Sequence, residues 1–416
     1  MKPKAVNIGA IRLDTPLILS PMAGVTNPPF RKLCREASMR GIPEGVTLKA
    51  LSRGESEEVP ASDIAHGSGV APVGLYVVEM VTSRALVEGH ASTHAILTPE
   101  PGETVRSVQL YGVDPGTVAR AAEISIQRGY ADHIDLNFGC PVPKVTKKGG
   151  GSALPWKLGH FAEIVGATVE VARRMSVDRD VPVPVSVKIR TGIDDEHTTY
   201  LDAGRLAQDA GVDAVTLHAR TTDQFYSGEA DWERIAALVE ALDVPVFGNG
   251  DVFDGDSTRR MMEETGCAGV AIGRAAQGRP WVFEEITAAL WGSPVMVAPR
   301  LEEICEVMRQ HAAGLVEYFQ DETAAMKEMR KHTGWYLRGF RIGGEAKRGL
   351  HQILTLDDLR KRLDALDQDQ DYPDAARGIH GRTGQPRRPH LPHRWLETRT
   401  IDEDARAVLA GAELGY

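Results

Sequence analysis

The fold of this chain is decided by the stretch Asp135-Leu-Asn-Phe-Gly-Cys140-Pro-Val-Pro-Lys-Val-Thr-Lys-Lys148-Gly149-Gly-Gly-Ser152. It begins inside a short apolar run, residues 133–137, that is typical of a strand, and Gly139, Pro141 and Pro143 then prevent further regular structure. A helix is expected from about Trp156. These breakers leave Cys140 at the tip of a turn, where a reactive thiol would lie. A buried structural cysteine is the alternative, because free cysteine is among the most buried residue types. The residues alone leave both interpretations open.

The composition is that of an ordinary globular chain. It has 416 residues, 42% hydrophobic and 25% charged, which is enough for one large domain and a smaller one. The four cysteines lie far apart without a CxxC pair, so we predict no disulfide framework, no metal site and a reducing compartment. No apolar run has the length of a membrane span, so we expect a cytoplasmic protein without a membrane partner. The net charge of −10 argues against indiscriminate polyanion binding but permits a local basic surface.

Residues 17–283 alternate short apolar runs with amphipathic stretches, the pattern of strand–helix units around a parallel sheet. The eight predicted strands are Leu17–Ser20, Gly74–Val78, Arg106–Leu110, His133–Asn137, Val183–Ile189, Ala214–His218, Val244–Gly248 and Gly269–Ile272. Polar or glycine-rich residues follow at least six of them, and a (βα)8 barrel places its active site at this end of the strands. A doubly wound sheet would usually carry a GxGxxG turn after its first strand, and none follows here. The predicted fold class is α/β: a TIM (βα)8 barrel followed by a small C-terminal all-helical domain.

The remaining segments suggest three further units, which are an insertion within the barrel, a helical domain and a tail. We assign residues 1–295 to the barrel, with the acidic, breaker-rich segment 41–69 as a surface insertion of disordered or lid-like character. Residues 296–366 are predicted to form the helical domain. Positive charge gathers there at Lys327, Arg330, Lys331, Arg338, Arg341, Lys347 and Arg348, interleaved with His332, Trp335, Tyr336 and Phe340. This pattern fits either a solvated helical face with core aromatics or a phosphate-contacting surface with stacking residues. The basic, proline-rich tail, 367–416, is expected to be poorly ordered unless docked.

Taken together, the strand-end residues resemble those of the tRNA-dihydrouridine synthases, flavin-dependent barrel enzymes with a C-terminal helical domain. The matching motifs are Ser20-Pro-Met-Ala-Gly-Val-Thr-Asn27, Val108-Gln-Leu110, Asp135-Leu-Asn-Phe-Gly-Cys-Pro141 through Gly149-Gly-Gly-Ser-Ala153, Val187-Lys-Ile-Arg190, Leu217-His-Ala-Arg-Thr221, Gly248-Asn-Gly-Asp251 and Gly273-Arg-Ala-Ala-Gln-Gly-Arg-Pro-Trp281, with a fainter match in Arg330-Lys-His-Thr-Gly-Trp-Tyr336. The segment 41–69 and the tail are departures, as is Asn27, where the family usually has Asp.

The resemblance implies a reaction. It is the FMN-dependent, NADPH-driven reduction of the C5=C6 bond of specific uridines in tRNA, with hydride passing from reduced FMN to C6. A cofactor is needed because no protein side chain can donate a hydride. Cys140 would be the general acid that protonates C5, a role that suits a thiol because its ordinary pKa of about 8.5 keeps it mostly protonated near neutral pH.

The resemblance also implies residue roles. The FMN contacts would be Pro21, Met22, Ala23, Gln109, Lys188, His218, Asn249, Gly250, Asp251, Gly273 and Arg274, with the phosphate over the last two strand ends. Lys188 would place positive charge near N1 and O2 of the flavin and favour its reduced form. The substrate contacts would be Asn137, Arg190 and Arg220 at the base and Lys144, Lys147 and Lys148 at phosphates.

Two other functions stay open at this stage. One is a dihydroorotate dehydrogenase-like FMN oxidoreductase acting on a free pyrimidine, which would not need a basic helical domain. The other is a non-catalytic RNA-binding barrel protein, which would not need Cys140, Lys188, His218 and Arg274 together. The expected partners are tRNA and NADPH, and no obligate protein partner is implied.

Overall fold

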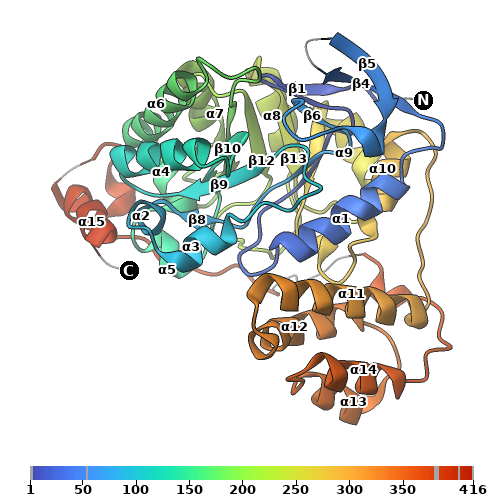
Figure 1. Ribbon diagram of the computed structural model, residues 1–416. Helices are drawn as coiled ribbons and strands as arrows, with labels where there is room; N and C mark the ends of the chain where they lie inside the picture. Colours follow the sequence, from blue (N-terminus) through green and yellow to red (C-terminus); the bar gives the residue numbers. More distant parts are fainter. Residues whose placement is uncertain (1–2, 53–54, 379–383, 402, 415–416) are drawn as a thin grey trace.

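The computed structural model describes residues 3–52, 55–378, 384–401 and 403–414, and its core is a parallel β-barrel (Figure 1). The sheet order is β7-β3-β14-β13-β12-β11-β10-β9-β8. The strands are β3 (Leu17–Leu19), β7 (Leu75–Tyr76), β8 (Val81–Thr82), β9 (Ser107–Tyr111), β10 (His133–Phe138), β11 (Val185–Arg190), β12 (Ala214–His218), β13 (Val246–Asn249) and β14 (Gly269–Ile272). A parallel bridge joins Val77, next to β7, to Ser107 of β9, which also pairs with β8, so β7 and β8 act as one interrupted strand that closes the barrel. The predicted TIM-barrel fold class is confirmed.

A ring of helices surrounds the barrel. They are α1 (Pro28–Arg40), α2 (Ser83–Val87), α3 (Ala91–Ile96), α4 (Pro115–Gln127), α5 (Pro143–Thr146), α6 (Leu158–Met175), α7 (Tyr200–Ala210), α8 (Trp232–Ala241), α9 (Gly255–Thr265) and α10 (Val282–Leu290). Asp114 caps α4 by accepting the backbone N–H of Thr117 at 2.7 Å. Asn27 caps α1 in the same way through Phe30 at 3.2 Å, so the family's usual Asp is replaced by an equally good capping residue.

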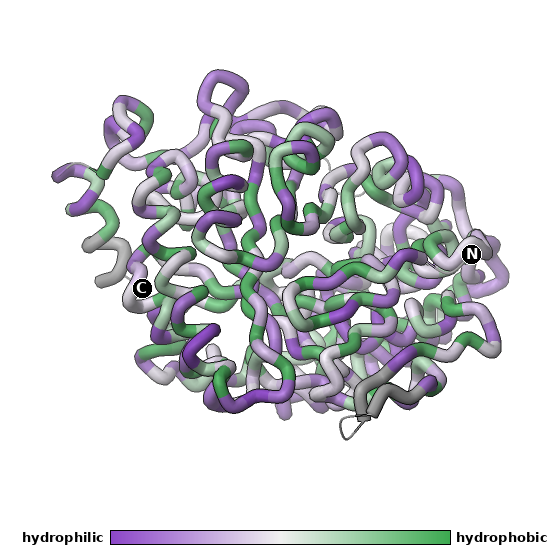
Figure 2. The backbone as a smooth tube through the Cα atoms, turned by 90° about the horizontal axis from the view of Figure 1, so that it is seen from above, coloured by the Kyte–Doolittle hydropathy of each residue, from purple (hydrophilic) through white to green (hydrophobic). Residues whose placement is uncertain are grey.

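The amino-terminal end of the barrel is closed by apolar side chains. The hairpin of β1 (Val6–Ile8) and β2 (Ile11–Leu13) pairs with β6 (Val70–Ala71) and packs Ile8, Ile11 and Leu13 against strand residues. Seen from above in Figure 2, green hydrophobic segments run through the middle of the molecule, and the loops that project at its outside are mostly hydrophilic. The opposite, carboxyl-terminal end is therefore the one left for a site.

The segment 41–69 lies at the closed end of the barrel. It contains the hairpin β4 (Thr47–Ser52) and β5 (Glu55–Pro60), which appears beside β1 in Figure 1. Leu48 and Ile64 pack with Trp291, whose indole N–H donates to Thr15 just before β3 at 3.0 Å. None of the described residues of this segment lines the cavity at the other end. The lid-like character that the sequence suggested is therefore wrong.

The helical region after the barrel has its own core. It comprises α11 (Leu301–Phe319), α12 (Glu322–Tyr336), α13 (Gly343–Leu350) and α14 (Leu356–Asp364), drawn in orange below the barrel in Figure 1. Phe30 of α1 packs against the rings of His311 and His332, at centroid distances of 5.7 and 5.9 Å, and so joins barrel and helices. None of the helices in the described ranges is long and apolar enough to span a membrane.

The tail returns to the barrel after crossing the helical region. Tyr372 and Ala376 still belong to the helical core, whereas Trp395 is buried against the barrel. The last helix, α15 (Glu403–Leu414), lies on the side of the barrel away from α11–α14 (Figure 1). The tail therefore packs against the helical core at Tyr372 and Ala376 and against the barrel at Trp395.

Candidate active site

A cavity of about 350 Å³ opens at the carboxyl ends of the barrel strands. Its walls contain all the residues predicted to contact FMN, namely Pro21, Met22, Ala23, Gln109, Lys188, His218, Asn249, Gly250, Asp251, Gly273 and Arg274, together with Asn137, Cys140 and Arg190. These residues come from seven different strand ends, and only the closure of the barrel brings them together.

The Cys140 loop is held by hydrogen bonds to its backbone. The side-chain oxygen of Asn137 accepts the N–H groups of Gly139 and Cys140, at 3.1 and 3.0 Å. The carbonyl of Cys140 accepts both the backbone N–H of Ser152, at 3.0 Å, and its hydroxyl, at 3.1 Å. Burial raises the pKa of the Cys140 thiol, so it stays protonated at neutral pH. Cys140 is half-buried, whereas the other three cysteines are buried.

A chain of side-chain hydrogen bonds leads from the barrel interior to this loop. Asp135 accepts the hydroxyl of Ser186 and the amide N–H of Gln109, each at 2.6 Å. The oxygen of Gln109 then accepts the amide N–H of Asn137, also at 2.6 Å. Burial raises the pKa of Asp135 to about 6, so above that pH it is ionised and only accepts hydrogen bonds. The carboxylate therefore fixes which way the Gln109 and Asn137 amides face.

The cavity is rich in positive charge. Lys188 donates to Asn249 at 2.9 Å, and burial, with neighbouring Arg190, lowers its pKa to about 8. Arg190 donates to the carbonyls of Gly139 and Thr221, at 2.8 and 2.7 Å. Burial lowers the pKa of both Arg190 and Arg274 to about 10. Desolvated cations of this kind are stabilised by an anionic ligand, so the site favours one.

Arg220 is not among the residues that line the cavity. It is fully buried, and one of its nitrogens lies 2.8 Å from both carboxylate oxygens of Asp251. Its Nε donates to the carbonyl of Ser227 at 2.9 Å. These contacts hold the loop after β12, and the predicted role of Arg220 as a substrate contact is not supported.

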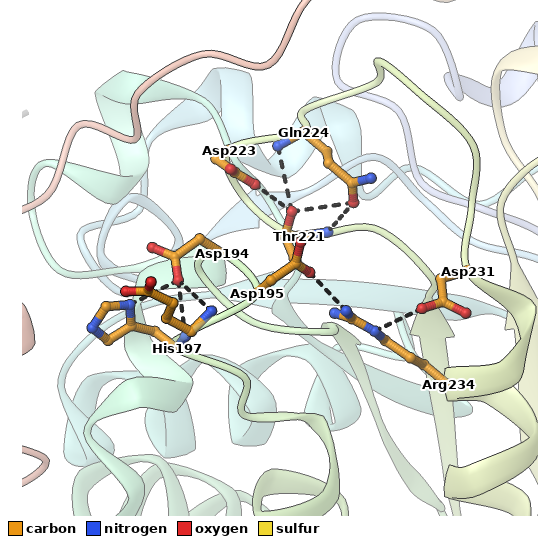
Figure 3. A network of polar contacts seen from close by, with 9 residues as sticks. Asp194, Asp195, His197, Thr221, Asp223, Gln224, Asp231 and Arg234 are labelled. Carbon is orange, nitrogen blue, oxygen red and sulfur yellow. Dashed lines mark hydrogen bonds and ion pairs between the residues drawn. The ribbon is translucent and has the colours of Figure 1, made fainter.

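A network of hydrogen bonds and ion pairs connects the loops near Arg220 (Figure 3). Gln224 accepts the backbone N–H of Thr221 at 2.8 Å. Arg234 bridges Asp195 and Asp231, at 2.7 and 2.9 Å, and so links the loop after β11 to the start of α8. The rim of the cavity on this side is therefore fixed by contacts among its own residues.

Two buried polar atoms in the cavity wall lack a hydrogen-bond partner among the described residues. They are the hydroxyl of Ser20 and Nε2 of His218. Burial, together with Arg190 and other nearby cations, holds the pKa of His218 well below its ordinary value, so the imidazole is neutral. Buried polar groups normally have partners, which indicates that a polar ligand completes these two.

The last two strand ends have the backbone of an anion site. Gly250 and Asp251 both have positive φ, 117° and 58°, which turns successive peptide groups in the manner of an anion-binding nest. A Cβ on Gly273 would meet nothing nearer than Ser20, at 3.9 Å, so open space adjoins this turn. With Arg274 alongside, the donor set fits a phosphate group.

Tyr226 is a cavity residue that the sequence did not reveal. Its ring lies beneath the guanidinium of Arg274, at 4.2 Å, and near that of Arg190, at 5.4 Å. The available signal was its position, eight residues after the strand end at His218 in a loop that also holds Phe225. An aromatic residue in a loop is too common for that signal to stand out.

The loop at Pro21–Gly24 touches the helical region. The backbone N–H of Gly24 donates to the carboxylate of Glu79 at 2.6 Å, and its carbonyl accepts Lys331 of α12. The cavity wall and the helices after the barrel are therefore directly connected.

The predicted phosphate contacts lie outside the cavity. Lys144 and Lys147 are exposed around α5, next to the Cys140 loop, while Lys148 is half-buried. In the helical region, Arg338, Arg341, Lys347 and Arg348 are exposed, but His332, Tyr336 and Phe340 are buried in the core. These three aromatic residues are therefore not a stacking surface, although the exposed charges fit a phosphate-contacting one.

Comparison with known proteins shows the family of this chain. The model of the dihydrouridine synthase (Dus) family matches residues 18–374. The chain belongs to the dihydrouridine synthase family. A protein named "Probable tRNA-dihydrouridine synthase" from Mycobacterium tuberculosis is 46% identical over 411 residues, covering 98% of this chain and 96% of the relative. The one from Mycobacterium leprae is 46% identical over 398 residues, covering 95% and 99%. The tRNA-dihydrouridine synthase B of Pseudomonas aeruginosa is 37% identical over 332 residues, covering 80% and 86%.

The family match divides the chain at a structural boundary. The dihydrouridine synthase model ends at residue 374, between Tyr372 and Ala376, which are the last members of the helical core along the chain. Residues 375–416, most of the tail, lie beyond that match, although the alignment with the Mycobacterium tuberculosis relative covers nearly the whole chain.

Proposed function

We propose that this chain is a tRNA-dihydrouridine synthase, a flavin-dependent oxidoreductase that reduces the C5=C6 bond of uridines in tRNA. One observation carries the proposal: Cys140, with a protonated thiol, lines the same cavity as all the residues predicted to contact FMN. Membership of the family and the names of the relatives support tRNA as the substrate.

The cavity suits FMN. Arg274 and the peptide groups near Gly250 and Gly273 would hold its phosphate, and Pro21–Ala23 would contact its ring system. Gln109, His218 and the hydroxyl of Ser20 would meet polar atoms of the ring, which would give the two unpartnered groups their hydrogen bonds. When bound, the flavin supplies the hydride for C6, with NADPH as the proposed reductant.

The chain's own contribution is to place a proton and to bind the base. Burial keeps the Cys140 thiol protonated, and Asn137 and Ser152 hold it in position to protonate C5. Arg190 lies near the thiol, and two carbonyl groups hold its guanidinium in position. It would contact the uracil or the adjoining phosphate. A uridine must leave its stack to enter, which costs a few kcal/mol and must be offset by such contacts.

The tRNA would lie across the carboxyl-terminal end of the barrel. Lys144, Lys147 and Lys148 beside the Cys140 loop, and the exposed basic residues of α12 and α13, would contact phosphates. Because such contacts release counterions, binding should weaken strongly with salt.

The test uses the purified full-length protein. We expect a yellow protein, or one that becomes yellow with FMN, that forms dihydrouridine in tRNA when NADPH is supplied. Turnover of free dihydroorotate or orotate without RNA would instead identify a free-pyrimidine oxidoreductase. A protein that cannot be reconstituted with FMN but still binds tRNA would be a non-catalytic RNA-binding protein, and would overturn the proposal.

A further inference from the structure

The tail beyond the family match contacts the cavity rim at two places. We define the C-terminal strap as residues 384–401. At its start, the backbone N–H of Arg387 donates to the carbonyl of Asp223 at 2.7 Å, and the guanidinium lies 5.9 Å from the ring of Phe225. Phe225 in turn packs edge-on against Tyr226 in the cavity wall. The strap therefore begins beside one cavity loop.

The strap ends against the loop that carries Cys140. Trp395 is 2% exposed and donates its indole N–H to the carbonyl of Ala153 at 2.9 Å. Its ring covers Gly149, where an added Cβ would come within 2.7 Å of the indole. Gly149 also has a φ of 78°, so a side chain there would be strained for a second reason. The glycine run of the Cys140 loop thus provides the surface on which the tryptophan packs.

A buried lysine binds the strap next to Trp395. Lys157 is 1% exposed, and its ammonium donates to the carbonyls of Thr398 and Thr400, at 2.7 and 3.0 Å. The same ammonium lies 4.8 Å from the centre of the Trp395 ring. A buried charge is costly without partners, and the strap supplies two of them to the barrel residue Lys157. Arg399 adds an ion pair with Asp202 at 2.7 Å.

The strap contacts flank the residue that holds Cys140. Ser152, whose backbone N–H and hydroxyl both donate to the Cys140 carbonyl, lies between Gly149 and Ala153, the two residues that Trp395 touches. We propose that the C-terminal strap is part of the active site and holds the Cys140 loop in its reactive position, with Trp395 as the central positioning residue. This inference rests on the proposed function, since it assigns the strap to the loop of the proposed acid.

The strap also exposes positively charged side chains to solvent. Arg387 and Arg388 are exposed, and neither has a carboxylate partner in the part of the chain that the structure describes. A strap that served only to bind RNA would use these two residues, and its loss would weaken tRNA binding without changing the chemical step. The experiment therefore separates turnover from binding.

The experiment compares Trp395→Ala with Trp291→Ala in the full-length protein. Both tryptophans are buried and donate one indole hydrogen bond, but Trp291 lies at the closed end of the barrel. Thermal unfolding, kcat and KM for tRNA, and the rate of Cys140 alkylation by iodoacetamide, located by mass spectrometry, are measured for both. Trp395→Phe and Lys157→Met provide milder variants in case Trp395→Ala does not fold.

We expect Trp395→Ala to lower kcat about 10- to 100-fold with KM changed less than about threefold, because small displacements of a reacting group cost this much. Cys140 alkylation should become several-fold faster, whereas Trp291→Ala should lose stability without either change. A raised KM with normal kcat would identify an RNA contact and overturn the proposal. Equal effects of the two variants, or unchanged alkylation in all strap variants, would also overturn it. If wild type makes no dihydrouridine, the proposed function fails, but the alkylation rates still test the positioning.

Discussion

The side-chain oxygen of Asn137 accepts a hydrogen bond from the backbone N–H of Cys140 at 3.0 Å. Replacing Asn137 with Ala removes this bond and the one to Gly139, and we expect dihydrouridine formation to slow by about 10-fold or more because the thiol loses its position. The free energy of unfolding should fall by about 1–3 kcal/mol, as for other lost hydrogen bonds at buried groups. Turnover at saturating tRNA measures the first effect, and urea unfolding measures the second. Unchanged turnover would show that other contacts fix the loop.

Asp135 should control the same loop from a distance. In Asp135→Asn only one of the two positions that accept from Ser186 and Gln109 is still an oxygen, and in proteins where the new N–H faces Gln109, Gln109 turns over and presents its own N–H to Asn137. We expect lower turnover while FMN is still bound, and partial recovery in the double variant Asp135→Asn with Gln109→Glu. The pH profile gives a second check, because wild-type activity should decline as pH falls through about 6, where Asp135 gains a proton. A flat profile from pH 7 to 5 would contradict this relay.

FMN affinity should decrease as pH rises through about 8. The pKa of Lys188 is lowered to about 8 in the free protein, so its ammonium is present below this pH and is lost above it. An anionic ligand binds the charged form, so the Kd of FMN should increase roughly tenfold between pH 7 and 9. Fluorescence titration of the FMN-free protein measures this change. Lys188→Arg, which keeps its charge, should show a smaller change, and an equally steep increase in that variant would exclude Lys188 as the cause.

The strand pattern could be predicted from the sequence, because each barrel strand is a local apolar run bounded by breakers, and Leu17, Val187 and Val270 are indeed fully buried. The grouping of the residues that end those strands into one cavity was also predictable, because the topology of a barrel brings its strand ends together. The resemblance supplied their roles.

Other features depend on contacts between distant residues. Trp395 stands in a proline- and arginine-rich stretch with no helical or strand period, and only its partner 242 residues earlier in the chain explains it. The resemblance implied a substrate contact for Arg220, but the direction of its side chain is set by Asp251 in another loop. The lid-like interpretation of 41–69 failed because composition does not say at which end of a barrel a segment lies.

Arg220 should act through stability. Arg220→Gln removes the guanidinium that binds Asp251 at 2.8 Å in a buried setting, and we expect the free energy of unfolding to fall by about 3–5 kcal/mol. Arg234→Gln breaks a more exposed pair with Asp195 and should cost less than about 1 kcal/mol. Urea unfolding compares them. A stable Arg220→Gln protein with a raised KM for tRNA would return Arg220 to the substrate contacts.

The exposed lysines beside the Cys140 loop should contribute to tRNA affinity. Lys147→Ala should weaken binding modestly and reduce the slope of log affinity against log salt by about 1, which corresponds to one phosphate contact. Filter binding between low and moderate salt measures the slope. Lys49→Ala, which changes a described residue of β4 at the closed end of the barrel, is the matched control and should leave the slope unchanged. Salt-independent binding by the wild type would contradict the proposed tRNA surface.

The most direct test of the proposed function is a single-turnover comparison of wild type with Cys140→Ala. Each protein is loaded with FMN, reduced with NADPH in the absence of oxygen, and mixed with excess tRNA that lacks dihydrouridine. We predict that wild type reoxidises its flavin and forms about one dihydrouridine per flavin, and that Cys140→Ala binds FMN and tRNA equally well but reacts at least about 100-fold more slowly, because its acid is missing. Equal rates in the two proteins would show that Cys140 is not the acid, and no reoxidation by tRNA in wild type would contradict the proposed reaction itself.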